Sequence, residues 1–402
     1  MNVLVVNAGS SSLKYQFFDT ATGSVVAKGN CERIGLDGKI THKQLQSGQT
    51  YTAEIPMPNH AVATRIVVDA LTNPEYGCVK SMDEIEAVGH RVVHGGPYFF
   101  ESVLVTPEVI EKLELCRDLA PLHTGPHLMG IAGCTEVMPN VPQVLVFDTA
   151  FHQTMPAEAF YYPIPYEMYE KYKIRRYGAH GTSHRYVAGE MIKLLGKPAE
   201  ETKIITCHLG NGSSISAVKG GKVIDTSMGL TPLDGVIMGT RCGSIDPAIV
   251  TFIMEKEGFT PAQMSDFMNK KCGFLGVSGI SSDCRDIENA INEGNERAAL
   301  ALNILNYQIK KFIGSYTAAM GGLDAIVFTA GIGENTSLVR EGALEGLDFL
   351  GIEIDKELNN SVRGKLTKLS TENSKVQVWL IPTNEELVIA SDTEAIVKAL
   401  NK

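Results

Sequence analysis

The sharpest hydrophobic pattern lies at the start of the chain. Residues 3–6 are all apolar, and the chain then passes through Asn7 into a Gly-Ser-Ser-Ser turn at residues 9–12. From residue 13 to 17, apolar and polar side chains alternate, which is the period of a half-buried strand. Two strands joined by a tight polar turn are therefore predicted. The N–H groups and hydroxyls of this turn can face a phosphate, with the charge of Lys14 beside them. An ordinary hairpin with a serine-rich turn fits the same pattern.

The same pattern recurs in the middle of the chain. Residues 204–218 again read as strand, glycine- and serine-rich turn, strand, and both copies continue through a glycine turn into a third strand, at 22–26 and 220–224. Such self-similarity predicts two related domains. We expect each domain to present a phosphate loop to a shared cleft. Two loops can hold different phosphates of one nucleotide, which indicates ATP.

Helical periodicity separates the predicted strands. Helices are expected at residues 61–71, 128–138, 186–195 and 295–320, and the final helix runs to residue 399. Residues 279–286 and the glycine turn at 331–335 are each expected to open a further helix. The helix over 295–320 carries too many apolar residues for one stripe, so it is expected to lie at the centre of a domain or in a dimer interface. Alternating strands and helices predict the α/β class.

Composition narrows the function classes. The chain has 402 residues, which favours two domains, and a formal net charge of −10, which argues against nucleic acid and anionic membranes as partners. No apolar run is long enough to cross a bilayer, and no signal peptide is predicted. The eight cysteines show no metal-ligand spacing and read as reduced cytoplasmic thiols.

Two candidate groups lie at predicted strand ends in the first half. Arg91 stands in a short apolar strand that runs into Gly-Gly, and its guanidinium fork matches carboxylate or phosphate oxygens. A solvated arginine on an edge strand is the alternative. Asp148 follows a buried strand, where α/β folds place reactive groups, although an Asx turn or helix cap fits as well.

The second half offers comparable groups. His180 lies between small residues and glycines and can approach a ligand, whereas His184 reads as a structural histidine. Arg241 lies in a glycine-punctuated loop, as a surface arginine or as the partner of Arg91 in clamping a small anion. A Gly-x-Gly turn at residues 331–333 suits the adenosine end of a nucleotide.

Several long motifs carry a family resemblance. The segments 7–14 and 208–214 resemble the signature motifs of acetate kinases, as do residues 89–96, 181–184, 238–241, 331–335 and 382–386. The resemblance covers nearly the whole chain. It implies two duplicated actin-like ATPase (ribonuclease H-like) domains around a central nucleotide cleft. The expected domains are residues 1–150, joined by the C-terminal helix 386–402, and residues 151–385.

The resemblance also implies an activity and its residues. The expected enzyme is a cytoplasmic homodimer that reversibly converts acetate and Mg-ATP into acetyl phosphate and ADP, with Mn²⁺ able to replace Mg²⁺. The resemblance implies that Asn7 and Glu385 bind the metal, that Arg91 binds the substrate carboxylate, and that Asp148 is the proton donor or acceptor. It also implies that His180 and Arg241 stabilise the transition state and that a methyl pocket is lined by Val93, Leu122 and Pro232. The residues implied to bind the nucleotide are Lys14, His208, Leu209, Gly210, Asn211, Gly212, Asp283, Cys284, Arg285, Gly331, Ile332, Gly333, Glu334 and Asn335.

Some points stay open at this stage. A carboxylate is already a nucleophile at neutral pH, so a positioning or metal-water role is preferred for Asp148. Ala179 stands where the family usually has an aromatic ring, so either the acyl pocket is larger or a neighbour such as Leu122 or Met228 fills it. The alternative functions are a kinase of propionate or another short carboxylate, and an actin-like ATPase or chaperone without a small acceptor.

Overall fold

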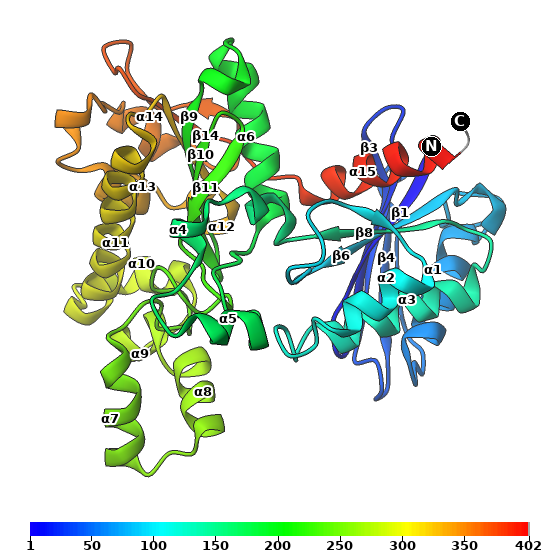
Figure 1. Cartoon of the computed structure of the whole chain (residues 1–402). Helices are drawn as coiled ribbons and strands as arrows, with labels where there is room; N and C mark the ends of the chain where they lie inside the picture. The colour runs from blue at the N-terminus through cyan, green and yellow to red at the C-terminus, as the bar shows by residue number, and fades with distance from the viewer. Residues whose placement is uncertain (401–402) are drawn as a thin grey trace. The chain divides into compact units, whose positions relative to one another are not determined.

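The computed structural model describes residues 1–400 and divides the chain into two compact units (Figure 1). Unit 1 comprises Met1–Phe151 and Asn384–Lys402, and unit 2 comprises His152–Thr383. Each unit contains one mixed sheet with helices on both faces. The C-terminal helix thus belongs to the same unit as the N-terminal strands.

The sheet of unit 1 has the strand order β5-β4-β3-β2-β1-β6-β8-β7. Strands β1, β6 and β8 run parallel, and the remaining neighbours are antiparallel. The strands are β1 (Asn2–Ala8), β2 (Ser12–Asp19), β3 (Ser24–Glu32), β4 (Lys39–Gln44), β5 (Thr50–Glu54), β6 (Ala87–Val92), β7 (Val103–Leu104) and β8 (Gln143–Phe147). The helices are α1 (His60–Thr72), α2 (Pro107–Glu114), α3 (Thr124–Val137) and α15 (Glu385–Leu400).

The sheet of unit 2 has the order β11-β10-β9-β12-β14-β13. Its strands are β9 (Lys203–Leu209), β10 (Ser213–Lys219), β11 (Lys222–Thr226), β12 (Ala325–Thr329), β13 (Thr367–Lys368) and β14 (Gln377–Leu380). Its helices are α4 (Ala157–Phe160), α5 (Tyr166–Tyr172), α6 (Gly181–Leu195), α7 (Pro247–Glu257), α8 (Pro261–Lys270), α9 (Gly273–Ser278), α10 (Cys284–Asn292), α11 (Glu296–Met320), α12 (Ala330–Asn335), α13 (Ser337–Leu344) and α14 (Lys356–Ser361).

The two units repeat one topology. The strand order β3-β2-β1-β6-β8 of unit 1 corresponds to β11-β10-β9-β12-β14 of unit 2, with the same parallel and antiparallel pairs. The predicted repeat of strand, polar turn, strand and third strand is confirmed. This repeat forms because each turn joins two antiparallel strands whose backbone N–H and C=O groups then pair with each other, so that few buried backbone groups stay unpaired.

Each sheet buries both faces. In unit 1, α1 and α3 pack on one face, and α15 packs on β1, β6 and β8 from the other. In unit 2, the long helix α11 packs on one face, and α6 packs on β9 and β12 from the other. The predicted long helix over 295–320 is confirmed, and Gly321 caps α11 with a left-handed backbone at φ 72°.

Two predicted helix starts were wrong by several residues. Helix α3 begins at Thr124 rather than near residue 128, and α6 begins at Gly181 rather than at 186. The first turns of both helices contain Gly, Thr, Ser or Pro instead of a periodic apolar stripe. Such residues are tolerated in a first turn, whose N–H groups lack helical partners.

Candidate active site

Three predicted site residues of unit 1 lie at the ends of neighbouring parallel strands. Val6 of β1 aligns with His90 of β6, so Asn7 and Arg91 are adjacent, and the Asp148 N–H donates to the carbonyl of Val92 at 2.9 Å. Because side chains alternate along each strand, all three face the side of the sheet that α15 covers. The carboxyl ends of parallel strands are where open α/β sheets hold ligands.

Arg91 joins two carboxylates in this cluster. Its Nη2 donates to Oδ2 of Asp148 at 2.7 Å and its Nε donates to the same oxygen at 3.1 Å, while Nε lies 3.8 Å from Oε2 of Glu385. The exposed side-chain fractions are 25% for Arg91, 2% for Asp148 and 18% for Glu385. Asp148 is thus ion-paired with Arg91, and Arg91 is not a solvated edge residue.

The cluster carries more negative charge than Arg91 can neutralise. Burial, together with the nearby charge of Asp148, raises the pKa of Glu385 to about 7, although Arg91 opposes this shift. Carboxylate and amide oxygens are the ligands that Mg²⁺ prefers, and Asn7 supplies an amide beside the two acids. The residues present therefore fit a divalent cation.

A pocket of about 360 Å³ opens beside this cluster on the same face of the sheet. Asn7, Lys14 and Glu386 line it, and Lys14 stands directly opposite Asn7 in the β1–β2 register. The Gly9 N–H donates to the carbonyl of Ser12 at 2.8 Å, which closes the polar turn between the strands. The predicted metal and phosphate residues of unit 1 are therefore neighbours.

The expected methyl-pocket residues differ in their surroundings. Val93 follows β6, and its N–H donates to Nε2 of His127 at 3.1 Å, where burial lowers the pKa of His127 to about 3. Leu122 exposes 77% of its surface, so it does not fill a closed pocket within unit 1. Pro232 belongs to unit 2, where its carbonyl accepts a hydrogen bond from Arg241.

Unit 2 brings His180 and Arg241 to the glycine turn after β9. A Cβ added to Gly212 would lie 3.3 Å from Nη1 of Arg241 and 3.5 Å from Cε1 of His180. A Cβ on Gly239 would likewise collide with Oδ1 of Asn211 at 2.3 Å. Gly239 therefore has no room for a side chain, whereas a Cβ on Gly212 would require the neighbouring side chains to give by a few tenths of an ångström. His180 itself has a left-handed backbone at φ 61°, a strained conformation for a residue with a side chain.

A hydrogen-bonded histidine cluster supports His180. Nδ1 of His180 and Nε2 of His184 lie 2.9 and 2.7 Å from Oγ of Ser214, and the ring of His180 stacks on that of His208 at 4.0 Å between centroids. Nδ1 of His208 lies 2.8 Å from Oγ of Ser183. His184 is fully buried, which confirms its predicted structural role. The cluster fixes the ring of His180 in one orientation.

Arg241 is a partly desolvated cation. Its Nη1 donates to the carbonyl of Pro232 at 2.8 Å and contacts Sδ of Met238 at 3.5 Å, and burial lowers its pKa. Both contacts are to neutral atoms. An anion beside this guanidinium would therefore recover electrostatic energy that burial has removed.

The remaining nucleotide candidates also belong to unit 2. Gly333 lies close to the glycine turn after β9: a Cβ added to Gly333 would lie 3.7 Å from Cβ of Leu209. Likewise, a Cβ added to Gly210 would lie 3.8 Å from Cβ of Ala330. Asp283 caps α10 and binds Arg285, which lowers the pKa of Asp283 to about 2. The ordered candidates His208–Gly212 and Gly331–Asn335 thus meet at the ends of β9 and β12, which pair in parallel.

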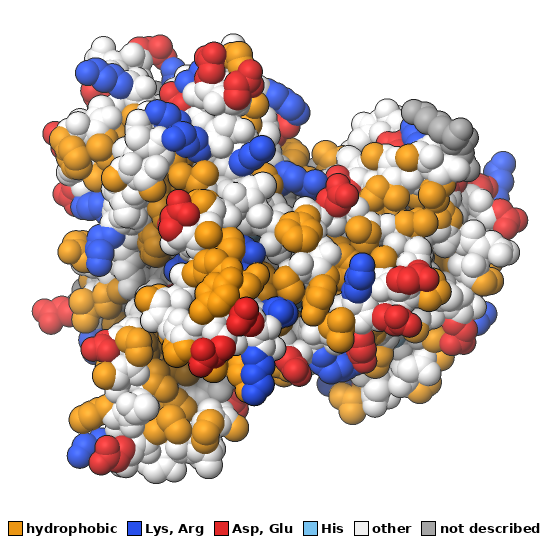
Figure 2. All heavy atoms as spheres, viewed as in Figure 1, with side chains coloured by type: hydrophobic (Ala, Val, Ile, Leu, Met, Phe, Trp, Pro, Cys, Tyr) orange, Lys and Arg blue, Asp and Glu red, His pale blue; other side chains and the backbone are white. Residues whose placement is uncertain are grey.

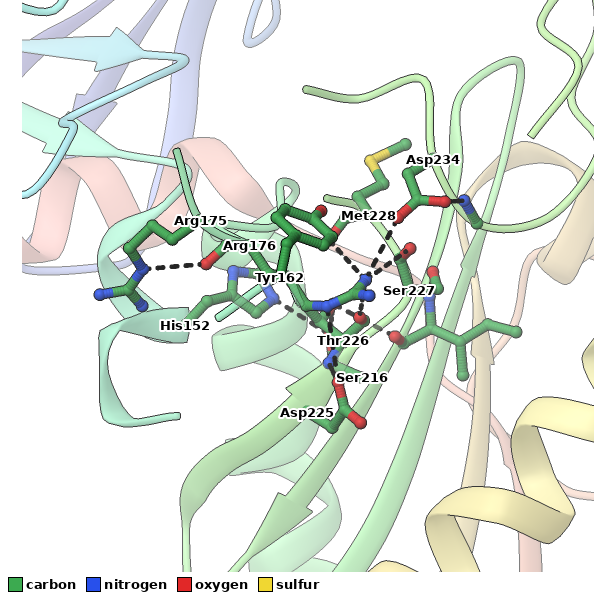
Figure 3. A network of polar contacts seen from close by, with 12 residues as sticks. His152, Tyr162, Arg175, Arg176, Ser216, Asp225, Thr226, Ser227, Met228 and Asp234 are labelled. Atoms are coloured by element: carbon green, nitrogen blue, oxygen red, sulfur yellow. Dashed lines mark hydrogen bonds and ion pairs between the residues drawn. The ribbon is translucent and has the colours of Figure 1, made fainter. Parts of the chain in front are cut away.

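Two arginines near these segments were missed as functional candidates. Arg176 donates to the carbonyls of Thr226 and Ser227 at 2.9 and 3.2 Å and to Asp234 at 3.4 Å, so it ties β11 to the loop that carries Pro232 (Figure 3). The sequence around Arg175 and Arg176 has neither helical nor strand periodicity, so no pattern marked Arg176 as a candidate. This arginine holds the loop without facing the glycine turn itself.

The second is Arg340 of α13, which is completely buried. Its Nη1 donates to the carbonyl of Gly333 at 2.9 Å, and Nε donates to Oδ1 of Asn359 at 2.7 Å. Burial lowers its pKa to about 10. One buried guanidinium thus fixes the backbone of the Gly-x-Gly turn, and the surrounding helical pattern offered no sign of it.

The comparisons with known proteins agree with this geometry. The profile of the Acetokinase family matches residues 2–391. The chain is 60% identical over 401 residues to an acetate kinase of Thermoanaerobacter pseudethanolicus, covering 100% of both chains, and 58% identical to one of Methanosarcina barkeri, covering 99% and 97%.

Solved structures give the same answer. The acetate kinase of Porphyromonas gingivalis superposes with a TM-score of 0.96 at 49% identity, covering 98% of this chain and 99% of that one. A propionate kinase of Francisella tularensis gives a TM-score of 0.90 at 41% identity, with the same coverage. The fold is accordingly the duplicated actin-like ATPase fold. The chain belongs to the acetokinase family and is a phosphotransferase that uses a carboxyl group as its acceptor.

Proposed function

We propose that the chain transfers the γ-phosphoryl group of ATP directly and in line to acetate, and runs the reverse reaction from acetyl phosphate and ADP. The observation that carries this proposal is the Arg91–Asp148–Glu385 cluster at the strand ends of unit 1. Phosphoryl transfer needs little covalent work from the protein, so positioning and charge neutralisation account for most of the catalysis.

Arg91 binds the acetate carboxylate in this proposal. Its Nη1 makes none of the contacts to Asp148 or Glu385 described above, so the guanidinium can face both an acid and a substrate. Asp148 orients Arg91, since a carboxylate nucleophile needs no general base at neutral pH. This role is supported by the bidentate contact and by the near-complete burial of Asp148.

Asn7 and Glu385 hold the divalent cation. Mg²⁺, or Mn²⁺ in its place, would neutralise charge on the phosphate oxygens when bound. Lys14 faces the same pocket and would contact a phosphate of ATP. The raised pKa of Glu385 supports the assignment, because it means that the protein alone does not supply enough nearby positive charge to stabilise the Glu385 carboxylate.

His180 and Arg241 stabilise the charge of the transferring phosphoryl group. A Cβ added to Gly212 would lie 3.3 Å from Nη1 of Arg241 and 3.5 Å from Cε1 of His180, so both side chains lie close to this turn. Burial also partly desolvates Arg241. His208–Gly212, Asp283–Arg285 and Gly331–Asn335 bind the nucleotide. Their support is the junction that β9, β12 and the glycine turns form within unit 2.

A wider acyl range is the second candidate function, favoured by the similarity to a propionate kinase. Buried Ala179 packs against Met228 and Met238, so methionine side chains occupy the room beside this small residue. Of the two fillers considered, Met228 packs against Ala179 within unit 2, whereas Leu122 belongs to unit 1. We propose that acetate is preferred, with some turnover of propionate.

A homodimer in the cytoplasm is also proposed. Helix α11 buries one side in the core of unit 2, yet Leu300 and Tyr307 on its other side expose 53% and 62% of their surface. The eight cysteines are free thiols, as expected in a reducing compartment. No helix within residues 1–400 is long and apolar enough to span a membrane. Light scattering should give twice the monomer mass, and Leu300→Asp should lower it.

Hydroxylamine trapping tests the proposed reaction. Acetate, ATP and Mg²⁺ with the enzyme should yield acetyl hydroxamate, and chelation of the metal should abolish it. Arg91→Ala should lose at least two orders of magnitude in rate. Arg117→Ala removes only an exposed ion pair with Glu114 and should keep its rate. ATP hydrolysis without hydroxamate would favour an ATPase without a small acceptor.

A further inference from the structure

Two cysteines lie beside Arg241 on segments that are hydrogen-bonded to each other. The Cys242 N–H donates to the carbonyl of Met268 at 3.1 Å, and the Cys272 N–H donates to the carbonyl of Thr240 at 3.1 Å. Oγ1 of Thr240 adds a bond to the carbonyl of Asn269 at 2.8 Å. These contacts hold the Arg241 loop against the segment that leads into α9.

The backbone contacts bring the two side chains next to each other, and the Cys242 thiol donates to the carbonyl of Gly243 at 3.2 Å. Interaction with the Cys272 thiol lowers the pKa of Cys242, and interaction with Cys242 raises that of Cys272. Cys242 is therefore the better nucleophile and Cys272 the proton donor. Both side chains are half-buried, whereas Cys31, Cys116, Cys134, Cys207 and Cys284 are buried. Small oxidants can reach the pair more easily than the buried cysteines.

We propose that Cys242 and Cys272 form an oxidisable dithiol site at which hydrogen peroxide reversibly switches off phosphoryl transfer. The Cys242 thiolate attacks the peroxide, taking one oxygen as a sulfenic acid while the other oxygen leaves as water after protonation. The Cys272 sulfur then attacks the sulfenic acid and releases a second water. Two thiols lose two electrons to the peroxide, and a disulfide remains.

The disulfide affects catalysis through the backbone. An S–S bond is about 2.05 Å long, shorter than any non-bonded sulfur contact, so its formation draws the two side chains together and pulls on the segments that carry them. Arg241 precedes Cys242 directly, and its carbonyl accepts from the N–H of Met238 at 3.2 Å. A shift of about 1 Å at a transition-state group can cost roughly 100-fold in rate. This part rests on the proposed role of Arg241.

The experiment treats the reduced full-length enzyme with excess hydrogen peroxide, then follows hydroxamate formation and non-reducing tryptic maps. Trypsin cleaves after Arg241 and Lys271, so the disulfide links the peptides 242–256 and 272–285. Cleavage before Asp283 separates Cys272 from Cys284. We expect the linked peptides to appear as activity falls at least tenfold, and dithiothreitol to reverse both changes.

Matched variants separate the site from general oxidation. Cys242→Ser and Cys272→Ser should stay active and lose sensitivity to peroxide, while Cys78→Ser, which alters the other half-buried cysteine, should remain sensitive. Absence of the linked peptides from wild-type enzyme would overturn the proposal even if a variant failed to fold. Linked peptides with unchanged activity would overturn the switch. An inactive reduced enzyme would instead count against the proposed function.

Discussion

Arg91 illustrates how much of the site in unit 1 depends on single charges. It is bound to Asp148 through two nitrogens and lies close to Glu385, so one guanidinium offsets two acids. Nearby Asp148 and Glu385 raise the pKa of Arg91 and keep it charged. Removing one member of such a partly buried network leaves the others uncompensated. Substitutions here therefore change both charge and geometry.

Alanine at Arg91 or Arg241 should lower kcat by about two orders of magnitude or more. Each loss removes a charge-assisted contact to a developing anion, which is worth roughly 2.7–4 kcal/mol by analogy with oxyanion-hole deletions. Steady-state kinetics and thermal melting check this, with Arg117→Ala as the surface control. Two variants that melt normally and keep their kcat would exclude an arginine clamp.

The pH dependence of stability should depend on Glu385. Its pKa is about 7 in the folded protein and about 4.3 in the unfolded chain. The folded state then binds the extra proton, so this contribution is complete below about pH 4.3 and is lost as pH rises through 7. The full change is about 4 kcal/mol.

Glu385→Gln removes this titration. In the absence of metal and nucleotide, its melting temperature should gain on that of wild type as pH rises from about 5 to 8. Glu111→Gln, an exposed helical substitution, should follow wild type at every pH. A constant difference between Glu385→Gln and wild type would show that Glu385 keeps an ordinary pKa.

Acyl selectivity should depend on Met228. Truncation to Ala frees space beside Ala179, so propionate should gain on acetate in kcat/KM by about tenfold, since one methylene is worth about 1–3 kcal/mol. Ala179→Phe should instead destabilise the protein, because Met228 and Met238 already fill the site. Met320→Ala, in the core around α11, should destabilise without changing the ratio.

At the scale of elements, glycines set how closely helices approach the sheets. A Cβ on Gly89 of β6 would lie 2.5 Å from Oγ1 of Thr393 and 2.7 Å from Cγ2 of Ile389, both on α15. The same helix begins with Glu385, so the packing of α15 on β6 also positions the Glu385 carboxylate beside Arg91. Packing and chemistry are coupled through one helix.

Gly89→Ala should therefore destabilise unit 1 and weaken catalysis. Overpacking of this kind costs about 1–3 kcal/mol, and the displaced helix should carry Glu385 away from Arg91. Thermal melting and the Mg²⁺ dependence of kcat measure the two effects. Gly189→Ala on α6 is the control: open space surrounds it, so it should stabilise by up to about 1 kcal/mol. Equal melting temperatures for both variants would contradict the close contact.

At the scale of the whole molecule, anionic substrates meet an acidic protein with a net charge of −10. Acidic and basic side chains are interspersed on the face that Figure 2 shows. Local groups, rather than the overall charge, must therefore offset substrate repulsion. The proposed reaction takes such groups from both units: Arg91 and Lys14 from one, His180 and Arg241 from the other.

Binding of Mg-ATP together with acetate should therefore make the molecule more compact. One reaction cannot use groups of both units unless its ligands engage them at the same time, and closure of this kind also excludes water. Small-angle scattering should show a smaller radius of gyration with both ligands than with either alone or none. An identical radius in every state would argue against closure.

The sequence by itself determined the repeat, the strand ends and the glycine turns. Apolar runs, period-2 alternation and glycines are local signals, and they placed Asn7, Arg91, Asp148 and His180 at the right ends of elements. The helix starts at Thr124 and Gly181 were misplaced, because a first turn carries no apolar stripe. The family resemblance supplied the residue roles, which local patterns alone left open.

Only the tertiary structure decided which of these side chains meet. The contact of Arg91 with Asp148, the hold of Ser214 on His180 and the pairing of Cys242 with Cys272 each join residues far apart in the chain. Periodicity reports which face of an element a residue occupies, but not the partner it finds there. Burial and charge then set the pKa of Glu385, because both depend on neighbours that folding alone brings together.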